Sequence, residues 1–201
     1  MLLCLALMWV SAAAVSEEAA FELGHMEGSS YVNPELGIAF DSTGFSGMEA
    51  IYVGEDLDES NGCGWNDAPA LIQKLDAGEM LTCYVLGDPS MKTAGAINVV
   101  QINVQKAEAG AEDAATALLE TGRAELEKAA AERGYNLAQA DIGEMDFLGA
   151  PTPCLTIDVE SNGRHKQSLY LAIAVEERVY RINFDMSASE VDGYLSHFSA
   201  L

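Results

Sequence analysis

The sequence predicts an α+β fold, with an antiparallel β-sheet packed between helices as an α/β/α sandwich. From Leu169 to Met186 large apolar residues alternate with smaller or polar ones, which is the period of a β-strand. Between residues 112 and 133 apolar residues instead recur at helical spacing. The chain has 201 residues, of which 49% are hydrophobic, so it can bury a substantial core.

The alternating stretch is expected to fold as a central hairpin. A turn centred on Glu177-Arg178 brings every large apolar side chain to one face of the sheet. This face is expected to be sealed by the long helix, with Leu126 of the helix beside the strand residues. The second face carries smaller residues such as Ala172, and another element should cover it in part. The predicted cross-strand pairs are Val175 with Tyr180, Ile173 with Ile182, and Leu171 with Phe184.

Shorter patterns supply the remaining elements. A phase slip at Val99-Val100 predicts a β-bulge. Residues 161–163 are expected to form a three-residue loop that sets Leu155 opposite Leu169, in preference to a two-residue Asn-Gly turn. The other expected elements are a hairpin of Tyr31-Val32 with Ile38–Phe40, strands at 50–53, 80–86, 96–105, 140–149 and 152–160, a helix at 67–78, and a last helix from Ser187 or Ser189 through Phe198.

The formal net charge of −22 limits the classes of partner. Ten basic residues against thirty-two acidic ones leave little to neutralise phosphates, which excludes nucleic-acid binding. The same charge disfavours anionic membrane surfaces. It favours cationic partners or bound cations, or it serves solubility alone.

The first residues indicate an extracytoplasmic protein. An apolar run at 2–10 followed by Ala12-Ala13-Ala14 is typical of a signal peptide, so we expect a signal at 1–14, a linker at 15–29 and a single domain at 30–201. The first Lys or Arg is Lys74, so the signal is either atypical or truncated; a buried N-terminal helix is the alternative. Membrane contact is expected only through this signal.

Three cysteines follow the expected signal: Cys63, Cys83 and Cys154. An odd number leaves at least one thiol unpaired or bonded to another chain. Their spacing matches no zinc signature. Two alternatives stay open, a Cys63–Cys83 disulfide or three unpaired and mostly buried thiols.

An acidic, Gly-rich segment at 41–67 contains the candidate cation site, a loop that would take Ca²⁺. An EF-hand loop requires Gly at its sixth position and Glu at its twelfth, and here these positions hold Asn61 and an Asp. A solvated acidic loop is the alternative. The candidate ligands are Asp56, Asp58, Ser60 and Asp67.

The same segment contains Gly62-Cys63-Gly64-Trp65, a candidate contact for a ligand or partner. A thiol between glycines is accessible, but no neighbouring His or cation in the sequence argues for a lowered pKa of Cys63. Trp65 is expected to close the edge of the sheet or to contact a ligand. The three histidines lie far apart in sequence, and the chain has no hydrolase, zinc-protease, P-loop or dinucleotide motif. We therefore expect no enzyme activity and no cofactor other than Ca²⁺.

The order of elements resembles the PsbP-like fold family. The residues that carry this resemblance are Tyr31-Val32-Asn33, Leu36–Phe40, the long helix, the central hairpin, and Ser189–Asp192 leading to Phe198. The family includes the photosystem II extrinsic protein, a Ran-binding import factor and bacterial envelope proteins. The resemblance implies an antiparallel sheet between helices and an accessory or binding role, although the long acidic segment departs from the family pattern.

Two functions remain open from the sequence. The first is a secreted or envelope-associated, non-catalytic accessory domain that docks an unknown protein partner. The alternative is a domain that binds a small molecule or divalent cation through the 41–67 segment.

Overall fold

A computed structural model describes residues 21–45, 47–88, 98–108, 113–161, 164–185 and 188–201. Its strands form two antiparallel sheets. The larger sheet has seven strands in the order β4 (Glu49–Tyr52), β5 (Leu81–Gly87), β6 (Asn98–Lys106), β10 (Arg178–Phe184), β9 (Arg164–Val175), β8 (Ala150–Ser161) and β7 (Asn136–Phe147). The smaller sheet has four strands in the order β1 (His25–Glu27), β2 (Ser30–Asn33), β3 (Ile38–Asp41) and β11 (Phe198–Ala200).

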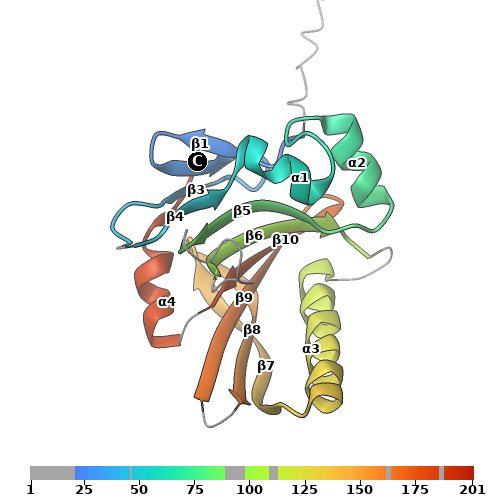
Figure 1. Ribbon diagram of the computed structural model, residues 1–201, viewed down its shortest axis with the longest axis vertical. Helices are drawn as coiled ribbons and strands as arrows, with labels where there is room; N and C mark the ends of the chain where they lie inside the picture. Colours follow the sequence, from blue (N-terminus) through green and yellow to red (C-terminus); the bar gives the residue numbers. More distant parts are fainter. Residues whose placement is uncertain (1–20, 46, 89–97, 109–112, 162–163, 186–187) are drawn as a thin grey trace, which may run out of the picture.

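Helices cover both faces of the larger sheet, as an α+β fold requires. In Figure 1, α3 and α4 lie on opposite sides of strands β8, β9 and β10. The helical elements are η1 (Gly54–Leu57), α1 (Asp58–Asn61), α2 (Ala68–Asp76), α3 (Ala114–Arg133) and α4 (Ala188–Leu195).

The main core lies between the two sheets. It contains Leu171, Ile182 and Phe184 of the central hairpin together with Tyr31 and Phe40 of the smaller sheet. Aromatic rings bridge the layers, with centroid distances of 4.6 Å for Tyr31–Tyr84 and 5.8 Å for Phe40–Tyr84. A second β-layer therefore covers the face that the long helix was expected to seal.

A second core lies on the opposite face, beneath α3. Its buried residues are Ala115, Leu119, Leu155, Ile157, Ala172 and Val179. Leu126 packs against this second core, whereas Ile173 and Ile182 belong to the main core, so the predicted placement of the long helix is wrong. Size complementarity explains the difference, because an Ala-rich helix approaches small residues such as Ala172 closely.

The central hairpin forms with the predicted faces but a different register. Its turn is Glu176-Glu177, and Ile173 pairs with Tyr180, two residues away from the predicted partner. A shift of two residues keeps every side chain on its face, so alternation alone could not detect it. The turn requires Glu176 at φ 51°, a conformation that its residue type does not predict.

The β8–β9 register also differs from the prediction. Leu155 pairs with Tyr170 and Ser161 with Arg164, which is the register of the rejected two-residue turn. The turn residues themselves, 162 and 163, lie outside the described residues. The error came from assigning Leu155 to the main face, whereas Leu155 belongs to the second core and Cys154 faces the main core.

The helices predicted at 67–78 and 112–133 and the bulge predicted at residues 99–100 form close to their expected positions. Asp67 caps α2 by accepting a hydrogen bond from the backbone N–H of Ala70. The long helix is capped by Asp113 and ends at Gly134, which has φ 72°. The β5–β6 register shifts between Leu86 and Gly87, opposite the predicted bulge at residues 99–100. The last helix ends earlier than predicted, and Phe198 lies in β11 instead.

Part of the predicted 15–29 linker is folded into the domain. Phe21 and Leu23 are buried in the main core, and residues 25–27 form β1. The guanidinium of Arg178 lies 4.2 Å from the Phe21 ring centroid. The linker prediction is therefore wrong from residue 21 onward. The small and charged residues around Phe21 and Leu23 gave no sign that these two side chains are buried.

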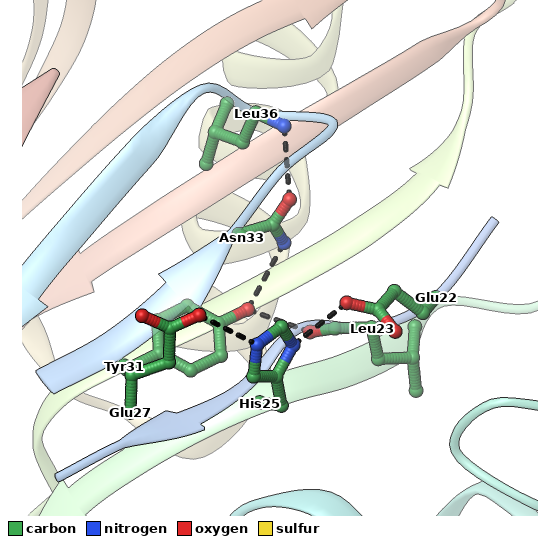
Figure 2. Close-up of polar contacts among 7 residues, drawn as sticks. All are labelled: Glu22, Leu23, His25, Glu27, Tyr31, Asn33 and Leu36. Carbon is green, nitrogen blue, oxygen red and sulfur yellow. Dashed lines mark hydrogen bonds and ion pairs between the residues drawn. The ribbon is translucent and has the colours of Figure 1, made fainter. Parts of the chain in front are cut away.

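A buried chain of hydrogen bonds ties this segment to the smaller sheet (Figure 2). The Tyr31 hydroxyl donates to the carbonyl oxygen of Leu23 at 2.6 Å and accepts from Asn33 Nδ2 at 3.0 Å. Asn33 Oδ1 accepts in turn from the backbone N–H of Leu36 at 2.9 Å. These contacts join the N-terminal segment, β2 and the β2–β3 turn.

A histidine lies beside this chain at the surface. Figure 2 shows the His25 ring between two carboxylates, with Nδ1 at 2.8 Å from Glu22 and Nε2 at 3.3 Å from Glu27. Hydrogen bonding to Glu22, assisted by Glu27, raises the pKa of His25.

We expect Tyr31→Phe to lower the free energy of unfolding by about 1–3 kcal/mol, because it leaves a buried carbonyl and a buried amide without partners. Urea denaturation followed by circular dichroism measures this change. Tyr135→Phe is the matched control: Tyr135 is 42% exposed, and its replacement should change stability by less than about 0.5 kcal/mol. Equal effects of the two substitutions would contradict the role of the Tyr31 hydroxyl.

Candidate functional site

The acidic segment folds into turns and short helices beside β4, at one edge of the larger sheet, and side-chain hydrogen bonds to the backbone hold them. Asp58 Oδ1 accepts from the backbone N–H of Trp65 at 2.8 Å, and Ser60 Oγ donates to the carbonyl of Leu57 at 3.0 Å. Asp67 caps α2, while Asp56 is exposed. Three of the four predicted cation ligands, Asp58, Ser60 and Asp67, thus stabilise turns and a helix end.

Asn61 connects the acidic segment to strand β5 of the larger sheet. Its side chain donates to the carbonyl of Thr82 at 2.9 Å and accepts from the N–H of Thr82 at 3.0 Å. The β4–β5 pairing stops at Tyr52, and the β5–β6 register shifts after Thr82. The buried amide of Asn61 therefore replaces a strand partner at this irregular point.

Among the described residues, no group of three or more His, Cys, Asp or Glu side chains could hold a metal ion. Calcium binding by Asp56, Asp58, Ser60 and Asp67 stays a prediction.

The three described cysteines are unpaired, in agreement with the second of the two alternatives. Burial raises the pKa of the Cys63 thiol, and the positive charge of the nearby Lys74 reverses only part of this rise. Burial also raises the pKa of Cys83 and Cys154. These thiols behave as small apolar groups rather than as activated nucleophiles.

Trp65 packs in part against the main core, and its carbonyl accepts from the N–H of Leu23 at 3.3 Å. A contact of Cys63 or Trp65 with a ligand or partner stays a prediction. His197 makes a separate local contact, with Nδ1 at 3.0 Å from the carbonyl of Asp41.

The strongest candidate for a docking surface is β7, which the sequence analysis did not single out. This strand spans Asn136–Phe147, pairs with β8 on one side and forms the edge of the larger sheet. The backbone N–H and C=O groups on the free side of an edge strand can pair with another extended chain. The strand was predicted from its residues, but its position at the edge depends on the strand order.

The edge strand carries unpaired negative charge. Among the described residues, Asp141, Glu144 and Asp146 form no ion pair. Asp141 accepts a hydrogen bond from Gln139, and Asp146 accepts one from the N–H of Gly149. The charges therefore remain available to a cationic partner.

Large apolar side chains are exposed at both ends of this edge. Tyr135 immediately precedes β7 and is 42% exposed, and Leu148 immediately follows it and is 41% exposed. Leu148 has φ 54° in the β7–β8 turn, an unusual backbone conformation for a bulky residue. The edge thus combines open backbone groups, carboxylates and two apolar ends.

Comparison with solved structures finds several similar chains, and two of them are the following. The solution structure of cyanobacterial PsbP (CyanoP) from Synechocystis sp. PCC 6803 has 13% sequence identity and a TM-score of 0.45, over 89% of this chain and 96% of that chain. A crystal structure from Bacteroides thetaiotaomicron VPI-5482 has 10% identity and a TM-score of 0.40, over 88% of this chain and 49% of that chain. No family model and no curated protein sequence matches.

The first of these structures is a PsbP, the family that the order of elements resembles. At these identities and TM-scores, no residue role and no function passes from either protein to this chain. Within the described residues, no helix has the length and apolar character needed to cross a membrane.

We expect Asn61→Ala to lower the free energy of unfolding by about 2 kcal/mol or more, because it leaves the backbone N–H and C=O of Thr82 unpaired. Chemical denaturation measures the loss. Asn66→Ala, at an exposed position of the same segment, should have little effect. A neutral Asn61→Ala substitution would show that the amide does not support the sheet.

We expect Cys63 to react with iodoacetamide more slowly in the native protein than in the unfolded chain, because its raised pKa leaves less thiolate at pH 8. The native rate should continue to rise above pH 9.0, the usual pKa of the group. Peptide mapping by mass spectrometry assigns the rate to Cys63. A faster reaction in the native protein would instead identify an activated thiol.

Proposed function

We propose that this chain is a non-catalytic, extracytoplasmic binding domain that docks a protein partner along the free edge of β7. The occupant is an extended, cationic segment of the partner, which adds a strand beside β7. Main-chain hydrogen bonds supply affinity in this mode, and side chains supply specificity. The observation that carries the proposal is a twelve-residue edge strand whose carboxylates form no ion pair with the described residues.

The overall charge supports a cationic partner. At a net charge of −22 the protein attracts basic segments over long range and repels acidic ones. Asp141, Glu144 and Asp146 place part of this charge at the free edge, and the exposed side chains of Tyr135 and Leu148 add apolar contacts at its ends. Charged residues on an edge strand also prevent pairing between copies, so the test must separate attraction from this protective effect.

The test uses two ten-residue peptide probes, one alternating Lys with Val and one alternating Glu with Val. We expect saturable binding of the Lys/Val peptide alone, measured by fluorescence anisotropy. Hydrogen exchange should show protection of β7 backbone amides in the complex.

Substitutions locate the site. The triple variant Asp141→Asn/Glu144→Gln/Asp146→Asn should weaken binding by about tenfold, since each exposed charge contributes a fraction of a kcal/mol. The control, Glu55→Gln/Asp56→Asn/Glu59→Gln, changes the net charge equally on another surface and should bind nearly as the wild type does. Equal losses in both variants, or protection away from β7, would contradict docking at this edge.

A further inference from the structure

A group of polar side chains lies on the α3 face of the larger sheet, beside the second core. Thr82 pairs with Asn103, which pairs with Arg181 across the β6–β10 ladder. One step along the same face, Gln101 pairs with Asn183. Thr82, Gln101, Asn103, Arg181 and Asn183 are called the polar cluster below. They share the face of Val179 in the second core because alternate residues of a strand point the same way.

Three atoms of the polar cluster are buried without a hydrogen-bond partner: Asn103 Nδ2, Arg181 Nε and Asn183 Oδ1. Asn103 is only 1% exposed. Its Oδ1 accepts from Gln101 Nε2 at 2.9 Å and from Thr82 Oγ1 at 3.3 Å, which leaves its amide nitrogen as an unused donor. Buried polar groups without partners are rare and costly, so three on neighbouring positions require an explanation.

The guanidinium of Arg181 forms no ion pair with the described residues. Its Nη2 donates to the sulfur of Met80 at 3.5 Å, and its Cζ lies 5.3 Å from the centroid of the Tyr170 ring. Among the described residues no carboxylate lies within ion-pair distance of it, and Glu125 of α3 acts only electrostatically. Desolvation by burial lowers the pKa of Arg181, which reflects the uncompensated charge.

We infer that the polar cluster binds a small molecule through its carboxylate. Arg181 Nε and Asn103 Nδ2 are closed to solvent, so a ligand reaches them only when the side chains that cover them move aside. A carboxylate then accepts hydrogen bonds from both groups, and charge-assisted contacts of this kind are the strongest available. An N–H group beside the carboxylate would satisfy Asn183 Oδ1. The cluster contains a single cation within a chain of net charge −22, which fits a singly charged carboxylate better than a phosphate.

This site is independent of the proposed docking edge. In the strand order β10-β9-β8-β7, two strands separate β10 from β7. A protein that fails to bind the peptide at β7 can therefore still be tested for carboxylate binding at the polar cluster, and the reverse also holds.

The test is a titration of the full chain with N-acetylglycine at constant ionic strength, followed by NMR of the side-chain amides. We expect saturable shifts of the Asn103 and Asn183 amide signals. N-acetylglycinamide, which lacks the charge, and inorganic phosphate should bind at least about tenfold more weakly. Absence of a saturable shift, or equal binding of either control compound, would overturn the inference.

Two variants separate binding from folding. Arg181→Met keeps an apolar stem over Tyr170, removes the guanidinium and should weaken N-acetylglycine binding by about tenfold or more. Arg123→Met, on a partly exposed position of α3, makes the same charge change and should bind as the wild type does. Asn183→Leu removes the unpartnered acceptor, and it should leave the melting temperature unchanged or higher while binding weakens. Undiminished binding by Arg181→Met and Asn183→Leu would overturn the assignment.

Discussion

The position of the smaller sheet depends on one half-buried contact between the β2–β3 turn and the start of β10. Glu35 forms an ion pair with Arg178, and its second carboxylate oxygen accepts from the Tyr180 hydroxyl at 2.7 Å. Removing one partner from such a pair leaves an uncompensated charge near the core, so the pairing strongly favours one arrangement of the layers. This contact and the Tyr31–Tyr84 ring contact together determine which face of the larger sheet is covered by strands.

That arrangement assigns different roles to the two faces and to the free edge. The large apolar side chains of the central hairpin pack against the smaller sheet, which leaves the Ala172 face to α3. A 20-residue helix is about 30 Å long but only one helix wide, so it covers β7, β8 and β9 far better than β5 and β6. The polar cluster lies on the part of this face that α3 does not cover, and the outer edge of β7 remains open.

The acidic character of the chain has more than one structural consequence. Asp58, Asp67 and Asp113 cap turns and helices, where carboxylates accept backbone N–H groups. At the β7 edge Asp141 and Asp146 accept neutral hydrogen bonds, and none of Asp141, Glu144 and Asp146 forms an ion pair among the described residues, so their charges are available to a partner. Arg181 is a largely desolvated cation that forms no ion pair with the described carboxylates. Local capping could be predicted from residue spacing, whereas the isolation of Arg181 arises from strand pairing between distant segments.

The sequence by itself determined the class of most elements, the ends of the two longer helices and which residues of the central hairpin share a face, because these depend on periodicity and capping over a few residues. The tertiary structure decided the registers, since a shift of two residues preserves every face, as with Ile173 and Tyr180. It also decided that Leu155 faces α3, that β1 and β11 complete a second sheet, and that Asn103 and Arg181 are neighbours. These features depend on contacts between residues far apart in the chain, which local patterns do not encode.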